Sequence, residues 1–256
     1  MQLYFQKFGS GKPLVILHGL FGSSDNWATF ARQLSSELPY EIYTVDLRNH
    51  GRSPHHYSFS MEALVDDLQN FLVKNNIESP VLFGHSLGGK VILNYLTEPF
   101  SSDVKASVIV DIGLRNYSLK QSHSELLTVM KNSPVEEFTS RVMAEEYFSK
   151  LIPSVKMQHF VVKNLKRSKD NGFLWKLNLS AIDTYVDDLL KGVVYQEKNL
   201  VKTLFIKGEL SDYITLEDET LIQHSFEIVK IVTVQNAGHW VHADNPDALL
   251  NEVVLF

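Results

Sequence analysis

The chain has 256 residues, of which 44% are hydrophobic and 21% are charged, and its formal net charge is −6. This length allows one hydrophobic core with an insertion, or two small domains, and the composition does not indicate disorder. The modest acidic charge without a basic run argues against nucleic-acid and anionic-membrane partners. Cysteine is absent, which excludes disulfides, a thiolate nucleophile and a cysteine-ligated metal.

Targeting signals are not evident in the sequence. Residues 1–5 lack the charged start and long apolar run of a signal peptide. No later segment approaches the ~20 consecutive apolar residues of a membrane-spanning helix. We therefore expect a cytoplasmic protein without a membrane span.

Short apolar runs alternate with helical patterns through the first half of the chain, which is typical of a parallel sheet with crossover helices. The strands are expected at residues 3–8, 13–18, 41–46, 81–83 and 104–112, with the first at an edge of the sheet. Helices are expected from residue 27 to about residue 38, from Ser60 and from Lys90.

The pattern changes between Gly113 and Asn199, where helical spacing dominates and no convincing strand is present. Four helices are expected, at residues 118–130, 134–148, 154–166 and 180–190. The sheet resumes with strands at residues 201–207 and 229–234, and a last helix begins near Pro246. The predicted fold is an α/β core of residues 1–112 and 199–256, with residues 113–198 inserted as a helical cap over one end of the sheet.

The segment PVLFGHSLGGKV, residues 80–91, reads as an apolar strand that turns directly into a helix. Ser86 lies between Gly84 and Gly88, the arrangement of a nucleophile elbow. The glycines are needed because a Cβ at either position would obstruct the close approach of strand and helix. We expect the Ser86 hydroxyl to stand exposed beside the first amides of the helix.

Two other interpretations of this segment remain open. Gly84, Gly89 and Lys90 match most of a P-loop, but Val91 stands where a Ser or Thr should hold magnesium. The segment could also be an ordinary glycine-rich turn with an unreactive serine. The decision depends on whether the chain supplies a base, an acid and an oxyanion site.

His239 is the best candidate for the base, because it follows the last expected strand and the ligand site of a parallel sheet lies at the carboxyl ends of its strands. For His18, His50 and His85, which lie in glycine turns, we expect packing and loop hydrogen bonds. A metal site built on His239 and His242 is an alternative, but it lacks further ligands at suitable spacing.

Two aspartates compete to orient the base. Asp111 ends the strand after the elbow unit, where an unpaired carboxylate would be costly and an imidazole partner is favoured. Asp212 follows the next strand of the core. The non-catalytic alternatives are a loop acceptor for Asp111, and a surface carboxylate or helix cap for Asp212.

The oxyanion of a tetrahedral intermediate needs backbone donors that are already in place. Leu87 supplies one N–H as the residue after the nucleophile. Leu20 or Phe21 supplies the other from the loop after His18. The alternative for this loop is a simple tight turn.

These segments resemble the α/β-hydrolase fold family, and more narrowly the small esterases similar to bacterial YbfF and its mitochondrial relatives. The similarity covers nearly the whole chain. It lies in residues 18–23 (HGLFGS), 46–53 (DLRNHGRS), 84–90 (GHSLGGK), 175–179 (WKLNL) and 237–243 (AGHWVHA). The RNHG loop and the WKLN segment are more specific than the elbow, which the superfamily shares widely.

The resemblance implies an ester or thioester hydrolase without a cofactor or metal, with Ser86 as nucleophile and His239 as base. Most α/β-hydrolases have their acid three residues after the glycine that ends the seventh strand, which is Ser211 here, and Asp212 comes one position late. Esterases similar to YbfF take the acid from the end of the preceding strand, which matches Asp111. Asp111 is therefore preferred, with Asp212 as the substitute.

The resulting hypothesis is a serine esterase that cleaves small esters or thioesters of short to medium acyl chains through an acyl-enzyme intermediate. Phe21 and Trp240 are predicted to contact the substrate, and the cap helices and Phe21 to line an apolar acyl pocket. The alternative is a non-catalytic small-molecule receptor or regulator on the same scaffold. The sequence makes no prediction about oligomeric state.

Overall fold

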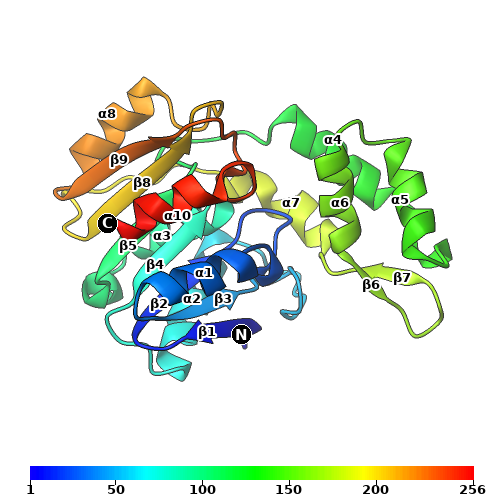
Figure 1. Ribbon diagram of the computed structural model, residues 1–256, viewed down its shortest axis with the longest axis horizontal. Helices are drawn as coiled ribbons and strands as arrows, with labels where there is room; N and C mark the ends of the chain where they lie inside the picture. Colours follow the sequence, from blue (N-terminus) through cyan, green and yellow to red (C-terminus); the bar gives the residue numbers. More distant parts are fainter.

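The computed structural model covers residues 1–256 and shows a layered core beside a smaller group of helices (Figure 1). The core contains a seven-stranded sheet of order β1-β3-β2-β4-β5-β8-β9, in which β1 is antiparallel to its neighbour and the other pairs are parallel. The expected edge strand, β1, indeed lies at the edge. The strands are β1 (Phe5–Gly9), β2 (Lys12–Leu17), β3 (Tyr40–Val45), β4 (Val81–His85), β5 (Ala106–Val110), β8 (Lys202–Gly208) and β9 (Val229–Val234).

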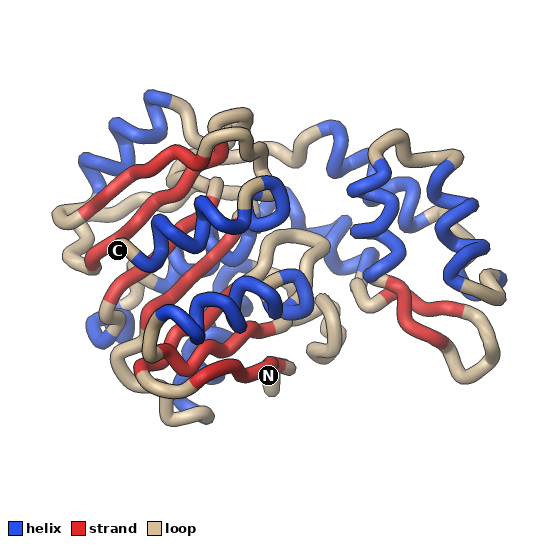
Figure 2. The backbone as a smooth tube through the Cα atoms, in the orientation of Figure 1, coloured by secondary structure: helices blue, strands red, loops and turns tan.

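Helices cover both faces of this sheet (Figure 2). One face packs against α1 (Ala28–Glu37) and α10 (Pro246–Val254). The opposite face packs against α2 (Met61–Lys74), α3 (Leu87–Tyr95) and α8 (Leu216–Ser225). The short helix α9 (Val241–Asp244) precedes α10. No helix combines the length and apolar character that crossing a membrane would require.

Strand β2 shows why the sheet is buried on both sides. Leu14 and Ile16 belong to the apolar cluster beneath α1, whereas Val15 and Leu17 belong to the cluster on the other face. Successive side chains of a strand point to opposite faces, so a doubly covered strand needs apolar residues at every position. The continuous apolar run in the sequence is the signature of this arrangement.

Residues 113–198, which we call the insert, lie beside the carboxyl edge of the sheet (Figure 1). Its helices are α4 (Gln121–Lys131), α5 (Arg141–Ser149), α6 (Val155–Lys163) and α7 (Leu179–Leu189), each within an expected helical range or shifted by one residue. The insert also contains a two-stranded antiparallel hairpin of β6 (Leu165–Arg167) and β7 (Phe173–Trp175). The expectation that this region has no strand was therefore wrong.

Short length explains why the hairpin was missed. Each strand has three residues, too few to show an alternating pattern. The available signal was the turn, where Asn171 has a positive φ of 64° and Gly172 follows. Helix α8 was missed as well, although Thr215 and Asp218 form a capping box at its start.

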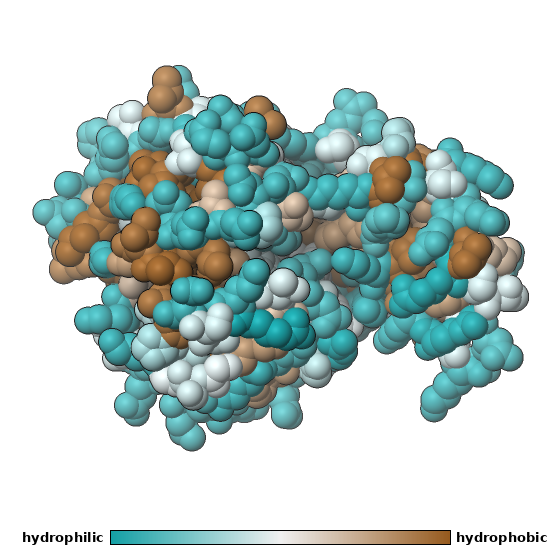
Figure 3. Space-filling model, viewed as in Figure 1, coloured by the Kyte–Doolittle hydropathy of each residue, from teal (hydrophilic) through white to brown (hydrophobic).

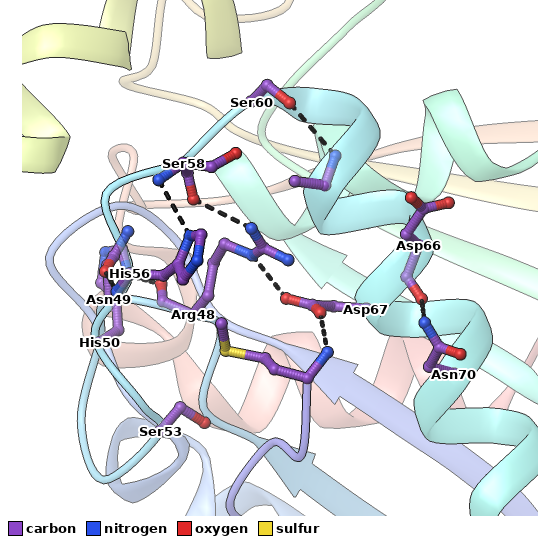
Figure 4. A network of polar contacts seen from close by, with 12 residues as sticks. Arg48, Asn49, His50, Ser53, His56, Ser58, Ser60, Asp66, Asp67 and Asn70 are labelled. Carbon is purple, nitrogen blue, oxygen red and sulfur yellow. Dashed lines mark hydrogen bonds and ion pairs between the residues drawn. The ribbon is translucent and has the colours of Figure 1, made fainter.

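The loop after β3 fastens the insert to the core. Arg48 Nε lies 2.6 Å from Asp67 Oδ2 in a buried ion pair with α2 (Figure 4). The next residue, Asn49, accepts a hydrogen bond from Asn178 Nδ2 at 3.1 Å through its side chain and one from the Asn178 N–H at 2.9 Å through its carbonyl. Asn178 is the N-cap of α7, so this helix begins at a fixed point on the core.

Candidate active site

Ser86 joins β4 to α3 at a sharp turn. Its backbone has φ 51° and ψ −113°, a left-handed conformation that non-glycine residues adopt at a cost. A Cβ on Gly88 would lie 2.3 Å from the Leu17 carbonyl oxygen, and a Cβ on Gly84 would lie 2.5 Å from the backbone of Gly88. These distances confirm that both positions require glycine.

His239 lies in the loop between β9 and α9 and faces Ser86. Its Nε2 lies 3.1 Å from Ser86 Oγ, and its Nδ1 lies 2.8 Å from Asp111 Oδ2. A carboxylate next to Nδ1 favours the tautomer that carries its proton there, which leaves Nε2 free to accept a proton from the serine. The three side chains therefore form a continuous hydrogen-bonded chain.

Asp111 is fully buried directly after β5 and has a positive φ of 51°. Its Oδ1 accepts a hydrogen bond from the Gly208 N–H at 3.1 Å, and its Oδ2 accepts one from the Ser211 hydroxyl. These donors, together with His239, satisfy a carboxylate that would otherwise be costly to bury. Ser211 occupies the position where most relatives of this fold are expected to carry the acid, and its contact with Asp111 was not predicted.

Asp212 points away from this chain. Its side chain is 76% exposed and forms an ion pair with Lys120, and the hydrogen bond from that lysine lowers the pKa of Asp212. The structure thus brings Asp111, and not Asp212, against the imidazole.

Two further residues hold His239 in place. The Tyr213 ring stacks on the imidazole, and its carbonyl accepts a hydrogen bond from the Tyr117 hydroxyl at 2.6 Å. On the other side, His85 Nε2 lies 2.8 Å from the His239 carbonyl oxygen. A loop hydrogen bond was expected for His85, but Tyr213 carries no signal in the sequence because the stack joins two loops that are distant in the chain.

The loop after β2 places backbone amides near Ser86. The Phe21 N–H donates to His50 Nε2 at 3.3 Å, whereas the Leu20 N–H has no acceptor within the protein. Leu87 is the first residue of α3, so its N–H also lacks an intrahelical acceptor. Leu20 and Leu87 therefore each present a free backbone amide at the site.

His18 and His50 support this loop as neutral side chains. Burial lowers the pKa of His18 to about 4 and that of His50 to about 3. In each ring Nε2 accepts from a backbone N–H, of Leu47 for His18 and of Phe21 for His50, so Nδ1 is the donor to a carbonyl. Both histidines make the loop hydrogen bonds predicted from their glycine turns.

Two pockets meet at Ser86. The surface is hollowed between the core and the insert (Figure 3). The polar pocket encloses about 860 Å³, part of it open to solvent, and its walls include Trp27, His85, Lys156, Phe160, Lys163, His239, Trp240 and His242. The apolar pocket encloses about 410 Å³, and its walls include Leu87, Tyr117, Leu119, Val186, Leu189, Leu190 and Tyr213. Both pockets are lined by Leu20, Ser86 and His123.

The predicted substrate contacts are only partly reproduced. Trp240 lines the polar pocket, but Phe21 is 1% exposed and lines neither pocket. The ring of Phe21 is instead buried in the core and stacks against His123, with ring centroids 6.3 Å apart. The prediction that Phe21 lines the acyl pocket was therefore wrong.

His123 of α4 is a pocket residue that the sequence did not reveal. Burial lowers its pKa to about 4, so it stands as a neutral group between the two pockets. It lies inside a predicted helix without any motif, and only the folding of the insert over the sheet brings it to Ser86.

The structure supports neither the P-loop at residues 84–90 nor the metal site at His239 and His242. The Lys90 ammonium donates to backbone carbonyls inside the protein, so it is not free to bind a phosphate as a P-loop lysine would. The structure places no group of three or more His, Cys, Asp or Glu side chains where they could share a metal ion.

A family model of the alpha/beta hydrolase fold matches residues 12–246. The chain belongs to the α/β-hydrolase fold family. Its relatives in this family include the sn-1-specific diacylglycerol lipase ABHD11 of Danio rerio, which is 33% identical over 98% of this chain and 80% of its own length. Esterase YbfF of Escherichia coli is 29% identical over 95% of this chain and 92% of its own length.

Among solved structures of α/β-hydrolases, a marine microorganism esterase matches this chain with a TM-score of 0.94 and 36% identity, over 100% of this chain and 99% of its own. Relatives named esterases and lipases support hydrolase activity for this α/β-hydrolase.

Proposed function

We propose that this protein is a serine hydrolase that cleaves carboxylic esters or thioesters of short to medium acyl chains. The observation that carries the proposal is the hydrogen-bonded chain from Ser86 Oγ through His239 to Asp111, with steps of 3.1 Å and 2.8 Å. A hydroxyl needs a base within this reach to act as a nucleophile, and the base needs a third group to orient it.

The reaction follows from these positions. His239 Nε2 accepts the Ser86 proton while Oγ attacks the acyl carbonyl, and the resulting oxyanion is stabilised by the Leu20 and Leu87 amides. His239 then donates the proton to the leaving oxygen or sulfur, which breaks the bond and leaves an acyl-serine. Water, deprotonated by His239, attacks the acyl-serine and releases the acid, which returns Ser86 to its starting state.

The two pockets receive different halves of the substrate. The leaving group must lie beside His239, which protonates it, and His239 lines the polar pocket but not the apolar one. The alcohol or thiol half therefore occupies the polar pocket, next to Trp240. The acyl chain occupies the apolar pocket between Leu87 and the α7 side chains, whose apolar walls suit a hydrocarbon chain.

Labelling with a fluorophosphonate probe and hydrolysis of p-nitrophenyl esters test the proposal together. The wild-type protein should be labelled and should release p-nitrophenol, whereas Ser86→Ala should do neither. Ser101→Ala, which replaces a buried serine hydroxyl of the core away from both pockets, is the matched control and should react as the wild type does. Labelling that survives in Ser86→Ala would show that another residue is modified.

The alternative function is a small-molecule receptor that keeps this scaffold without turnover, because a fold alone does not establish catalysis. Its distinguishing result is saturable binding of esters without release of p-nitrophenol and without labelling of Ser86. The hydrogen-bonded chain from Ser86 through His239 to Asp111 favours the enzyme, since binding alone does not require a base aligned on a serine hydroxyl.

A further inference from the structure

Lys90 is a buried cation without a carboxylate partner. It lies on α3, one turn after Ser86, and its exposed fraction is 0%. Its Nζ donates to the carbonyl oxygens of Arg115 at 2.7 Å, Lys191 at 3.0 Å and Leu114 at 3.5 Å. An ammonium has three N–H donors, so these carbonyls use its full capacity and compensate in part for its burial.

The three acceptors lie on the two segments that connect the insert to the core. The chain leaves the core through residues 113–117 and returns through residues 190–193, and we call these two segments the crossings. These crossings are also bonded to each other, because the Tyr117 N–H donates to the Leu190 carbonyl and the Val193 N–H donates to the Leu114 carbonyl, each at 2.8 Å. Lys90 therefore joins the elbow helix to both crossings through one group.

The groups around Lys90 have opposing effects on its pKa. Burial, and after it the nearby Arg115, lower the pKa of Lys90 to about 7, although Asp218 acts in the opposite direction. Arg115 forms an ion pair with Asp218 at 3.0 Å. The Tyr117 ring lies between the two cations, 4.9 Å from Lys90 Nζ and 4.1 Å from the Arg115 guanidinium carbon.

The same crossings continue directly into the walls of the apolar pocket. Tyr117 and Leu119 line it from the outgoing side, and Leu189 and Leu190 line it from the returning side. We propose that the Lys90 ammonium fixes both crossings to the elbow helix and thereby sets the width of the apolar pocket. Lys90 is thus a positioning residue for acyl-chain selection, and this kinetic role rests on the proposed esterase function.

Hydrogen exchange measures the anchoring itself, without any assumption about activity. In Lys90→Met, which keeps the length of the side chain but removes the ammonium, the amides of Tyr117 and Val193 should exchange faster than in the wild type, by about tenfold or more. Lys191→Met is the matched control. Its side chain is 71% exposed and its carbonyl acceptor is retained, so exchange at these amides should not change.

Kinetics with p-nitrophenyl acetate and p-nitrophenyl octanoate measure the effect on selection. In Lys90→Met the ratio of the two kcat/KM values should change by about tenfold, mainly through KM, because displaced pocket walls alter binding of the longer chain. A loss of folded protein alone would lower both rates equally and leave this ratio unchanged. Lys191→Met should keep the wild-type ratio.

If Lys90→Met does not fold, the same ratio is followed in the wild-type protein from about pH 6 to about pH 9, where Lys90 loses its proton. Both esters share the base and the leaving group, so the effect of His239 titration on kcat/KM cancels in the ratio. The ratio should therefore change with pH as Lys90 loses its proton. A flat ratio overturns the proposal, as does unchanged exchange at Tyr117 and Val193 in a folded Lys90→Met. A protein without esterase activity would refute the proposed function, and the exchange measurement would still decide the anchoring.

Discussion

The phenol ring of Tyr213 lies flat against the imidazole of His239, with ring centroids 3.8 Å apart and planes inclined by 15°. The hydrogen bonds of Nδ1 and Nε2 fix the direction of the imidazole within its plane. The two hydrogen bonds only weakly restrain tilting of the ring out of this plane. The stack on Tyr213 opposes that tilting. The base is therefore oriented by a face contact as well as by its hydrogen bonds.

Removal of this ring should impair turnover. We expect Tyr213→Ala to lower kcat by about 10- to 100-fold, because a misoriented base is a large loss for a reaction that depends on alignment. Tyr213→Phe retains the ring and should stay within about twofold of the wild type. The measurement is kcat and KM for p-nitrophenyl acetate with Tm as a folding control. Equal losses in both variants would assign the effect to the hydroxyl and not to the stack.

The choice of acid is tested by two matched amide substitutions. Asp111→Asn should lower kcat by about 10⁴-fold, because an amide at this position no longer favours the required tautomer of His239. Asp212→Asn removes an exposed carboxylate that contacts Lys120 and should change kcat by less than about twofold. Both are compared across an acyl-length series, and equal small losses would mean that neither aspartate orients the base.

Asn164 in the insert holds the loop after β2, which carries the Leu20 amide proposed to stabilise the oxyanion and is here called the oxyanion loop. Its Nδ2 donates to the Phe21 carbonyl at 2.9 Å and to the Phe160 carbonyl at 3.1 Å, and the residue is 4% exposed. In Asn164→Ala the Phe21 carbonyl loses this buried donor, at a cost of about 1–3 kcal/mol. The loop that carries Leu20 should shift, and kcat should fall by about 10- to 100-fold.

Asn70→Ala is the control for this substitution. Asn70 also donates to a carbonyl four residues earlier, that of Asp66, but at the surface of α2 (Figure 4). This variant should keep the kcat of the wild type for p-nitrophenyl esters. If Asn164→Ala also kept the kcat of the wild type, the insert would not support the oxyanion site.

Acid should destabilise the fold through its buried histidines. The pKa of His18 is lowered to about 4 and that of His50 to about 3, while an unfolded chain titrates near 6.5. Between these values the unfolded state binds more protons, so the free energy of unfolding decreases as pH falls through about 6.5. His18 alone would account for up to about 3 kcal/mol of this loss near pH 4. Burial also lowers the pKa of His85, His123 and His242.

Urea unfolding between about pH 7 and about pH 4.5 measures this loss. The denaturation midpoint of the wild type should fall steeply across that range. His55→Ala, which removes an exposed histidine, should follow the same curve. A midpoint that stays constant would show that the buried histidines take up protons in the folded state.

Local sequence patterns predict much of the fold. The doubly covered strands need apolar residues throughout, and the elbow needs glycine where strand and helix nearly touch, so both are visible in the sequence. The segments that follow β2, β4, β5 and β9 could be predicted to meet because the strands are parallel and expose their carboxyl ends together. This reasoning alone brings Ser86, Asp111 and His239 to one edge of the sheet.

The parts that were missed depend on contacts between distant segments. His123 and Asn164 reach the site only after the insert has folded over the sheet, and Tyr213 reaches His239 from another loop of the core. No spacing in the sequence encodes those contacts. Phe21 was expected to line an acyl pocket together with the apolar residues of the cap helices, but its ring is buried in the core. Lys90 resembled a P-loop lysine because of its spacing from Gly84 and Gly89. Its true carbonyl partners lie 24 or more residues away and are not visible in the sequence.

The insert is attached to the core not only by its two connecting segments but also by the side chains of Asn164 and Asn178, which bind the carbonyl of Phe21 and the side chain of Asn49. This has a consequence for enzyme engineering. A chimera that takes a foreign insert without equivalents of these two asparagines would lose support for its oxyanion loop even with intact junctions. Libraries that aim at new acyl specificity should therefore vary α4 and α7 and keep residues 164–178 unchanged.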